Sequence, residues 1–233
     1  MRDPLPGAIG LSKLCVYDTV NPDGLAGGTP HLHLCCTESY VVIAGAGRAQ
    51  TLSGQDGFAE HELRPGTVLW FTPGTIHRLI NDGGLEIMVL MSNTGLPEAG
   101  DAVLTFPLEI VRDPDRYARE NALPGGGAPG ADITAAYRRR DLAVQGFHEL
   151  RENALLDEFY EAAMKLKQPL LEDWRARWES GARAAAEQTG RQIAALLDGD
   201  PAHLRESRVS GKQGPDEVGR LGMCGLLNTY RYD

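Results

Sequence analysis

The stretch TPHLHLCCTE, residues 29–38, contains the pattern that decides how this chain folds. His31 and His33 are separated by one residue, so a β-strand through them places both imidazole rings on the same face. Glu38 follows five positions after His33, and a third histidine, His77, lies further along the chain. Imidazole nitrogens together with a carboxylate oxygen suit a divalent metal ion such as Fe, Mn, Ni or Zn. These four side chains are therefore candidate metal ligands.

The composition is that of an ordinary globular protein. A chain of 233 residues is long enough for one large domain, or for a medium domain with an appendage. The formal net charge of -9 argues against nucleic acid and against anionic membranes as partners. No apolar run approaches the length that crosses a bilayer, and the N-terminal residues lack a signal-peptide pattern, so we expect a cytoplasmic protein. The four cysteines show no CxxC spacing, which predicts free thiols.

Residues 1–107 show the pattern of short strands separated by turns. Apolar runs alternate with short segments rich in Gly, Asn, Asp and Pro, which break regular structure. The expected strands are residues 11–20, 38–44, 48–52, 59–63, 68–71, 76–80, 85–91 and 102–106. Strands spaced this regularly are typical of a sandwich or barrel. We predict an antiparallel all-β domain over residues 1–107.

The second half of the chain follows a different pattern. Residues 108–131 are predicted to be a linker or surface loop, because the segment LPGGGAPG within them cannot hold a helix. Over residues 132–205 apolar residues recur every three or four positions, which predicts helices. Asp132 is a candidate cap for the first helix, and Pro169 marks a break between two later ones. Residues 206–233 are polar and glycine-rich, a tail whose order the sequence leaves open.

Two other patterns have structural interpretations. Trp70 and Phe71 are adjacent on an expected strand, so only one of them faces the interior of a barrel. The basic run of residues 138–140 is interpreted as a solvated helix face.

The candidate ligands lie in an order that resembles the two motifs of the cupin superfamily. The first family motif is His-x-His, three or four residues, Glu, six residues and Gly; the second is Gly-x5-Pro-x-Gly-x2-His-x3-Asn. The matching residues in this chain are His31, His33, Glu38 and Gly45, then Gly66, Pro73, Gly74, His77 and Asn81. Pro73 falls one residue late, and Leu25 stands where the family has a glycine before the first histidine. Neither departure removes a ligand.

This resemblance, which covers residues 11–107, implies a mostly β fold. A double-stranded β-helix, or jelly-roll, barrel would hold the metal inside and be followed by an α-helical C-terminal region. Those helices would pack on the outside of the barrel or build a homodimer interface, and we expect a homodimer. Because Glu38 has the opposite strand parity to His31 and His33, a bend or a new strand must intervene near residues 36–37. Tyr40 then shares the face of Glu38, where it is a candidate catalytic residue or a packed core residue.

The resemblance also implies a function. Three histidines and one glutamate in this family often carry iron, which favours a dioxygenase-type reaction on a small molecule. One carboxylate leaves a net positive charge on a divalent ion, so we expect an anionic substrate that chelates through oxygen atoms. Two alternatives stay open: a Lewis-acid isomerase or lyase that uses Mn, Ni or Zn, and a non-catalytic cupin that binds a small ligand.

Overall fold

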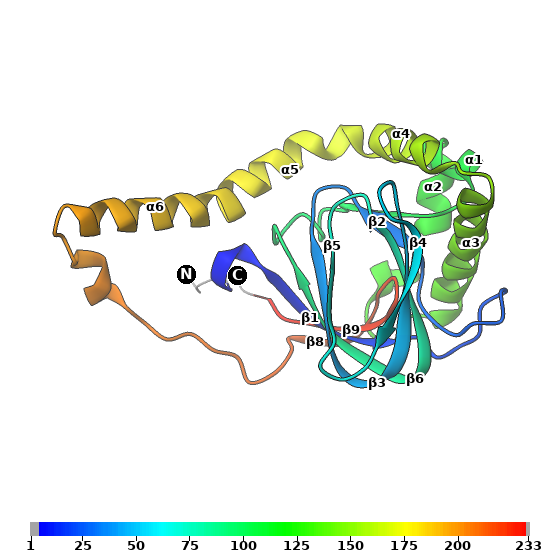
Figure 1. The fold of residues 1–233 in the computed structure, drawn as a ribbon, viewed down its shortest axis with the longest axis horizontal. Helices are drawn as coiled ribbons and strands as arrows, with labels where there is room; N and C mark the ends of the chain where they lie inside the picture. The colour runs from blue at the N-terminus through cyan, green and yellow to red at the C-terminus, as the bar shows by residue number, and fades with distance from the viewer. Residues whose placement is uncertain (1–4, 232–233) are drawn as a thin grey trace.

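The computed structural model describes residues 5–231 and shows a β-barrel with helices packed along one side (Figure 1). The described strands form one nine-stranded antiparallel sheet with the order β4-β3-β6-β1-β9-β8, in which β2 pairs with β6 and β7, and β5 pairs with β3. This confirms the prediction of a mostly β domain followed by helices. The strands are β1 (Gly10–Val16), β2 (His31–His33), β3 (Glu38–Ser53), β4 (Gly57–Leu63), β5 (Val68–Phe71), β6 (Ile76–Met91), β7 (Ala102–Leu104), β8 (Glu217–Leu221) and β9 (Gly225–Thr229).

The two longest strands, β3 and β6, each bend in the middle. The sequence predicts a turn within each of them, at residues 45–47 and 81–84, but the chain continues as one strand through bulges. Gly45 has a φ of +73°, and a Cβ atom there would lie 2.1 Å from the carbonyl oxygen of Gly84. The bend of β3 therefore packs against the bend of β6 through Gly45 and Gly84, because a side chain at position 45 would overlap the backbone of β6.

These bends carry β3 and β6 from one face of the barrel to the other. Residues 38–42 of β3 pair with β5 and with the end of β6, whose other edge pairs with β1. Residues 47–53 of β3 pair with β4 and with the start of β6, which pairs in turn with β2. The result is a two-faced jelly roll with an apolar interior. The buried residues between the faces are Leu14, Val16, Tyr40, Val42, Ala49, Leu63, Phe71, Leu79, Leu85, Ile87, Val89 and Cys224.

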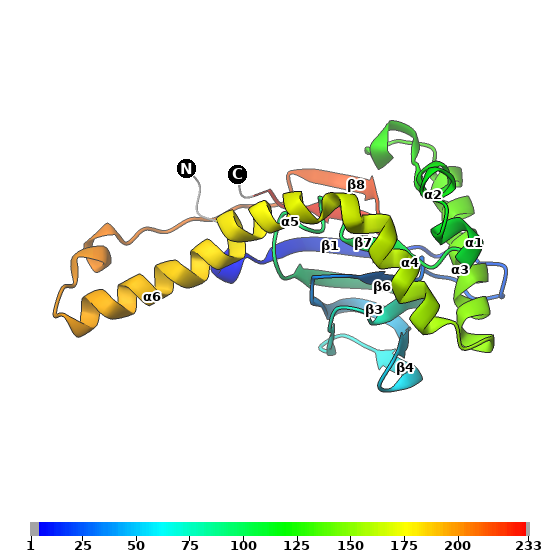
Figure 2. The ribbon, with the colours of Figure 1, turned by 90° about the horizontal axis from the view of Figure 1, so that it is seen from above.

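Helices cover the outer side of the face that contains β2 (Figures 1 and 2). Leu32 lies between the two histidines of β2, so its side chain points outward, where it is fully buried against Phe147 and Phe159. Gly146 allows close contact, since a Cβ atom there would lie 2.1 Å from the carbonyl oxygen of Thr105. The helices are α1 (Leu108–Val111), α2 (Pro114–Asn121), α3 (Ile133–Glu152), α4 (Leu156–Lys167), α5 (Leu171–Trp178) and α6 (Ala184–Leu197).

The prediction of a linker over residues 108–131 is wrong for the first half of this segment, which forms α1 and α2. Asp113 caps α2 by accepting a hydrogen bond from the backbone N–H of Arg116 at 3.0 Å. The backbone N–H of Leu104 donates to the Tyr117 hydroxyl at 3.0 Å, which attaches α2 to β7. Helices of four and eight residues are too short to show a clear periodicity in the sequence.

The predictions for the later helices are confirmed. Asp132 caps α3 through the backbone N–H of Thr134 at 2.9 Å. The chain breaks between α4 and α5 in a 3-10 turn that contains Pro169. A π-helical turn, Glu179–Arg183, joins α5 to α6. No residue of α6 is buried, and this helix extends away from the barrel (Figure 2).

The predicted tail, residues 206–233, contains a hairpin that joins the barrel. Strand β9 pairs with β1 and β8 pairs with β9, so the barrel includes strands beyond the predicted boundary at residue 107. Arg139 of α3 donates to the carbonyl oxygen of Gly222 at 3.0 Å, and the Tyr17 hydroxyl donates to the same oxygen at 3.1 Å. Arg139 and Arg140 are buried, which corrects their interpretation as a solvated face. Within residues 5–231, every helix is too short or too polar to traverse a bilayer.

Candidate metal centre

The four candidate ligands meet inside the barrel. His31 and His33 come from β2, Glu38 begins β3, and His77 lies near the start of β6. One donor atom from each lies within 4.8 Å of the others, and all four residues are buried. Nε2 of His77 is 2.8 Å from Oε2 of Glu38, and Nε2 of His33 is 3.3 Å from the same oxygen.

Strand register explains this convergence. His31 and His77 are directly opposite each other on β2 and β6, with ring centroids 4.3 Å apart. His33 shares their side of the sheet because it lies two residues after His31. The chain then bends through residues 34–37, as the parity argument predicts, and returns on the opposite face of the barrel with Glu38 directed inward. The site therefore joins the two faces of the jelly roll.

Hydrogen bonds orient the three rings. Nδ1 of His31 is 2.8 Å from the carbonyl oxygen of Thr29, and Nδ1 of His77 is 3.0 Å from that of Thr75. A carbonyl oxygen only accepts, so each Nδ1 carries a proton, and in the neutral ring the lone pair is then on Nε2. Nδ1 of His33 lies 3.1 Å from Oδ2 of Asp101. When the rings are neutral, this pattern directs all three Nε2 lone pairs to a cation.

The electrostatics of the cluster fit a bound cation. Oε2 of Glu38 and Nε2 of His77 are buried and have no hydrogen-bond partner among residues 5–231, although they lie 2.8 Å apart. Buried polar atoms without partners are costly, and a metal ion between them would satisfy both. Three nitrogen donors and one carboxylate oxygen are also a suitable donor set for a first-row divalent metal.

Burial and neighbouring charges shift the pKa values of these groups. Burial, reinforced by His77 and His33, lowers the pKa of His31 well below its ordinary value, so this ring is neutral. Burial opposes ionisation of Glu38, but His77 and His33 outweigh it and hold its pKa well below the ordinary value. For His33, burial is outweighed by Asp101 and Glu38, which raise the pKa to about 9. A cation at Nε2 of His33 would displace that proton, because metals bind the neutral ring.

Asp101 is a positioning residue that the sequence analysis missed. Its side chain is fully buried. In addition to its contact with His33, the Asp101 carboxylate accepts hydrogen bonds from the backbone N–H groups of Cys35 at 2.8 Å and of Cys36 at 3.2 Å. It therefore fixes both a ligand ring and the bend that leads to Glu38. Nothing in the sequence marks it, because an aspartate after a glycine is an ordinary loop residue.

Aromatic side chains pack around the ring of His77. Phe71 stacks on it with ring centroids 4.6 Å apart and an interplanar angle of 3°. Trp70 is 66% exposed, so the prediction that one of this pair faces inward is confirmed for Phe71. Tyr40 packs edge-on against Phe71 at 5.1 Å. Burial, followed by the Glu38 carboxylate, raises the pKa of Tyr40 well above its ordinary value, which keeps the hydroxyl protonated. A catalytic role for Tyr40 stays a prediction.

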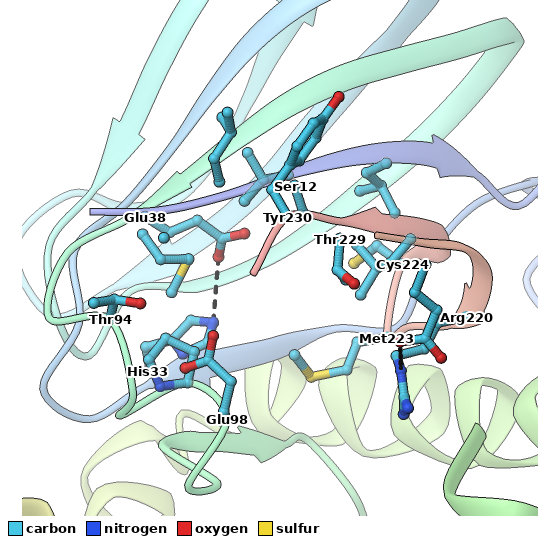
Figure 3. Close-up of a pocket in the computed structure, with 18 of the residues that line it drawn as sticks. Ser12, His33, Glu38, Thr94, Glu98, Arg220, Met223, Cys224, Thr229 and Tyr230 are labelled. Atoms are coloured by element: carbon cyan, nitrogen blue, oxygen red, sulfur yellow. Dashed lines mark hydrogen bonds and ion pairs between the residues drawn. The ribbon is translucent and has the colours of Figure 1, made fainter. Parts of the chain in front are cut away.

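A cavity of about 520 Å³ adjoins the metal-ligand cluster (Figure 3). His31, His33 and Glu38 line one part of it, and Met223 and Cys224 of the C-terminal hairpin line another. The hairpin residues were also missed by the sequence analysis, which assigned no structure to residues 206–233. As predicted, all four cysteines are free thiols.

Comparisons with known proteins show a family match for part of the chain. Residues 16–92 match the cupin domain family. The capsular polysaccharide assembling protein CapF from Staphylococcus aureus is 18% identical over 39% of this chain and 24% of its own, with a TM-score of 0.28. A predicted oxalate decarboxylase from Thermotoga maritima is 20% identical over 36% of this chain and 64% of its own, with a TM-score of 0.27.

A third solved structure is WlaRA, a TDP-fucose-3,4-ketoisomerase from Campylobacter jejuni. It is 12% identical over 39% of this chain and 64% of its own, with a TM-score of 0.32. This chain thus spans about a quarter of the CapF chain, and less than two thirds of the other two. No curated protein sequence matches this chain significantly.

Proposed function

Residues 16–92 match the cupin domain family, and from this match and the site geometry we propose that the protein uses one divalent metal ion to act on a small anionic molecule. The ion would be held by His31, His33, Glu38 and His77. The observation that carries this proposal is the convergence of the four donor atoms within 4.8 Å beside a cavity of about 520 Å³. A cavity of this size accommodates a small organic ligand.

The charge of the site favours an anionic ligand. Glu38 is the single carboxylate among the four candidate ligands, so a divalent ion would retain one net positive charge. Four protein donors leave two positions of a six-coordinate ion open when Glu38 binds through one oxygen, and one position when it binds through both. A molecule that chelates through a carboxylate and a neighbouring oxygen would fill those positions and neutralise the remaining charge.

We propose an oxygen-dependent oxidation of the dioxygenase type as the reaction. When bound, an iron ion supplies the redox chemistry, and imidazole and carboxylate donors suit it. The protein contributes positioning: the carbonyl oxygens of Thr29 and Thr75 fix two imidazoles, and Asp101 fixes the third. Phe71 covers one side of His77 and excludes water from that ligand.

Oxygen uptake on separately reconstituted protein tests this proposal. Metal-free protein is loaded with Fe(II), Mn(II), Ni(II) or Zn(II) and assayed with catechols, 1,3-diketones and 2-oxo acids. We expect oxygen consumption with the iron form, and its loss in Glu38→Ala but not in Glu120→Ala, a control on the exposed end of α2.

Two other experimental outcomes would indicate a function different from the proposed one. Turnover without oxygen uptake in the Mn, Ni or Zn forms would indicate a Lewis-acid isomerase or lyase. Stabilisation of the loaded protein by a panel compound without any turnover would indicate a binding module.

A further inference from the structure

We infer that the ligand of this site is elongated, with an oxygen-chelating anionic head at the metal ligands and a largely apolar body that lies across strands β6, β1 and β9. This inference rests on the proposed function and adds a substrate class to it. It follows from how residues of neighbouring strands line up along the cavity.

One row of residues crosses the floor of the cavity. Tyr40 on β3 is opposite Val89 on β6, which is opposite Ser12 on β1. Ser12 is opposite Thr229 on β9, and Thr229 is opposite Glu217 on β8. All five residues line the cavity. Because adjacent strands lie about 4.8 Å apart, this row extends about 19 Å along the sheet, from beside Glu38 to the C-terminal hairpin.

The side chains that flank the row are mostly apolar, although Ser12 and Thr229 place hydroxyl groups within it. Beside the central row, Met91 lies next to the metal-ligand end, and Leu14 lies opposite Leu227 further along. Met223 of the hairpin lines the cavity as well. Burying a ligand's apolar surface against these side chains stabilises the complex roughly in proportion to the area removed from water.

Charged side chains of the cavity gather at its two ends. Glu38 and Glu98 lie near His33, while Arg220 lies on β8 of the hairpin (Figure 3). At the hairpin end Glu217 accepts hydrogen bonds from Arg220 at 3.0 Å and from Arg231 at 3.3 Å. Two guanidinium groups and one carboxylate leave a net positive charge there, so this end accepts a neutral or anionic terminus and disfavours an ammonium group.

The cavity is also too large for a short acid alone. A volume of about 520 Å³ falls among pockets that hold ligands of drug-like size, on the order of 300–1000 Å³. A two- or three-carbon acid bound at the metal would leave the apolar side chains of Leu14, Leu227 and Met223 exposed to water. A longer ligand would cover them.

A series of chelators of increasing length tests this inference. The metal-loaded protein is titrated calorimetrically, without oxygen, with pyruvate, 2-oxohexanoate and 2-oxooctanoate. Because each buried methylene group is worth about fourfold in affinity, the five additional methylene groups of 2-oxooctanoate should make it bind up to about 1000-fold more tightly than pyruvate. An 8-amino-2-oxooctanoate probe should lose most of that gain. Equal affinities across the unsubstituted series would overturn the inference.

A substitution at Ser12, the central residue of the row, tests where the body of the ligand lies. Ser12→Phe places a ring midway along the floor, so it should abolish the dependence on chain length while metal and pyruvate still bind. Lys13→Phe is the matched control, because Lys13 is the next residue on β1, lies outside the cavity and pairs with Glu86 at 2.8 Å. Unchanged length dependence in Ser12→Phe would contradict the placement of the ligand body.

The two proposals fail differently. If the wild-type protein binds metal and pyruvate without any preference for length, the inference about the body fails and the metal centre stands. If the protein binds no divalent metal, the proposed function is wrong, and the inference about the ligand, which depends on it, is wrong as well. Should Ser12→Phe not fold, the wild-type series still decides between elongated and short ligands.

Discussion

Asp101 holds His33 by a hydrogen bond of 3.1 Å between its Oδ2 atom and Nδ1 of the ring. The same carboxylate accepts the backbone N–H groups of Cys35 and Cys36, which form the bend between β2 and β3. One buried side chain thus connects a ligand on one face of the barrel with the turn that delivers Glu38 to the other face. The geometry of the candidate metal centre depends on a residue that does not touch the metal position.

Replacing this carboxylate by an amide should weaken metal binding. Both oxygens of Asp101 accept N–H donors, so the NH2 group of Asp101→Asn meets a donor in either orientation. We expect a loss of about 10–100-fold in metal affinity, typical of changes to groups that orient metal-bound histidines. Competition with a chromogenic chelator measures it, with the exposed Asp115→Asn on α2 as control. Equal affinities in both variants would show that Asp101 does not position His33.

The orientation of β5 predicts unequal effects for two neighbouring aromatic residues. Phe71 is 5% exposed and stacks on His77, whereas Trp70 is 66% exposed. Phe71→Ala should lower the free energy of unfolding by about 3–5 kcal/mol. Trp70→Ala should change it by about 0.5 kcal/mol or less. Denaturant titration measures both, and a larger effect at Trp70 would contradict the strand orientation.

Two helix glycines should respond in opposite ways to alanine. At Gly146 in α3 a Cβ atom would lie 2.1 Å from the carbonyl oxygen of Thr105, so Gly146→Ala forces the helix off the sheet. We expect a loss of about 1–3 kcal/mol in stability. At Gly190 in α6 no atom lies within 4 Å of the added Cβ, and alanine has the higher helix propensity. Thermal unfolding followed by circular dichroism should show Gly190→Ala at or above the wild-type midpoint; the reverse order would contradict the packing of α3.

The pair formed by Asp23 and Arg78 should stabilise the fold in a pH-dependent way. Burial alone raises the pKa of Asp23, but the hydrogen bonds and charge of Arg78 outweigh it and lower the pKa to about 2. A lowered folded-state pKa gives stability that is present above the ordinary pKa and is lost as the pH falls toward 2.

Asp23→Asn should therefore cost about 1–2 kcal/mol at neutral pH, after allowance for solvent screening of this half-buried group. The difference from wild type should shrink between about pH 4 and about pH 2, because the wild-type carboxyl group becomes protonated there. Urea titrations at several pH values measure it, with the exposed Asp198→Asn as control. A difference that stays constant down to pH 2 would contradict the role of the ion pair.

The sequence predicts the four candidate ligands well because their placement depends on local rules. Alternation along β2 puts His31 and His33 on one face, and the parity of Glu38 requires the bend that the structure shows. The caps and breaks of the later helices are equally local, as Asp132 and Pro169 illustrate.

Contacts between distant segments could not be predicted in this way. Asp101 meets His33 across 68 residues, and the β8–β9 hairpin pairs with β1 from the other end of the chain. The sequence around Gly45 predicts a turn where the structure has a bend, because glycines mark both a hairpin turn and a bulge in a long strand. Only the partner strand, here at Gly84, distinguishes the two.

Metal content of the wild-type protein and of Glu38→Ala tests the central claim most directly. Both proteins are loaded with a divalent metal, desalted and measured by emission spectroscopy, with circular dichroism as the check on folding. We expect one equivalent of metal in the wild type and almost none in a folded Glu38→Ala, with the same loss in His77→Ala. Full metal content and an unchanged melting temperature in both variants would show that these side chains do not bind the metal.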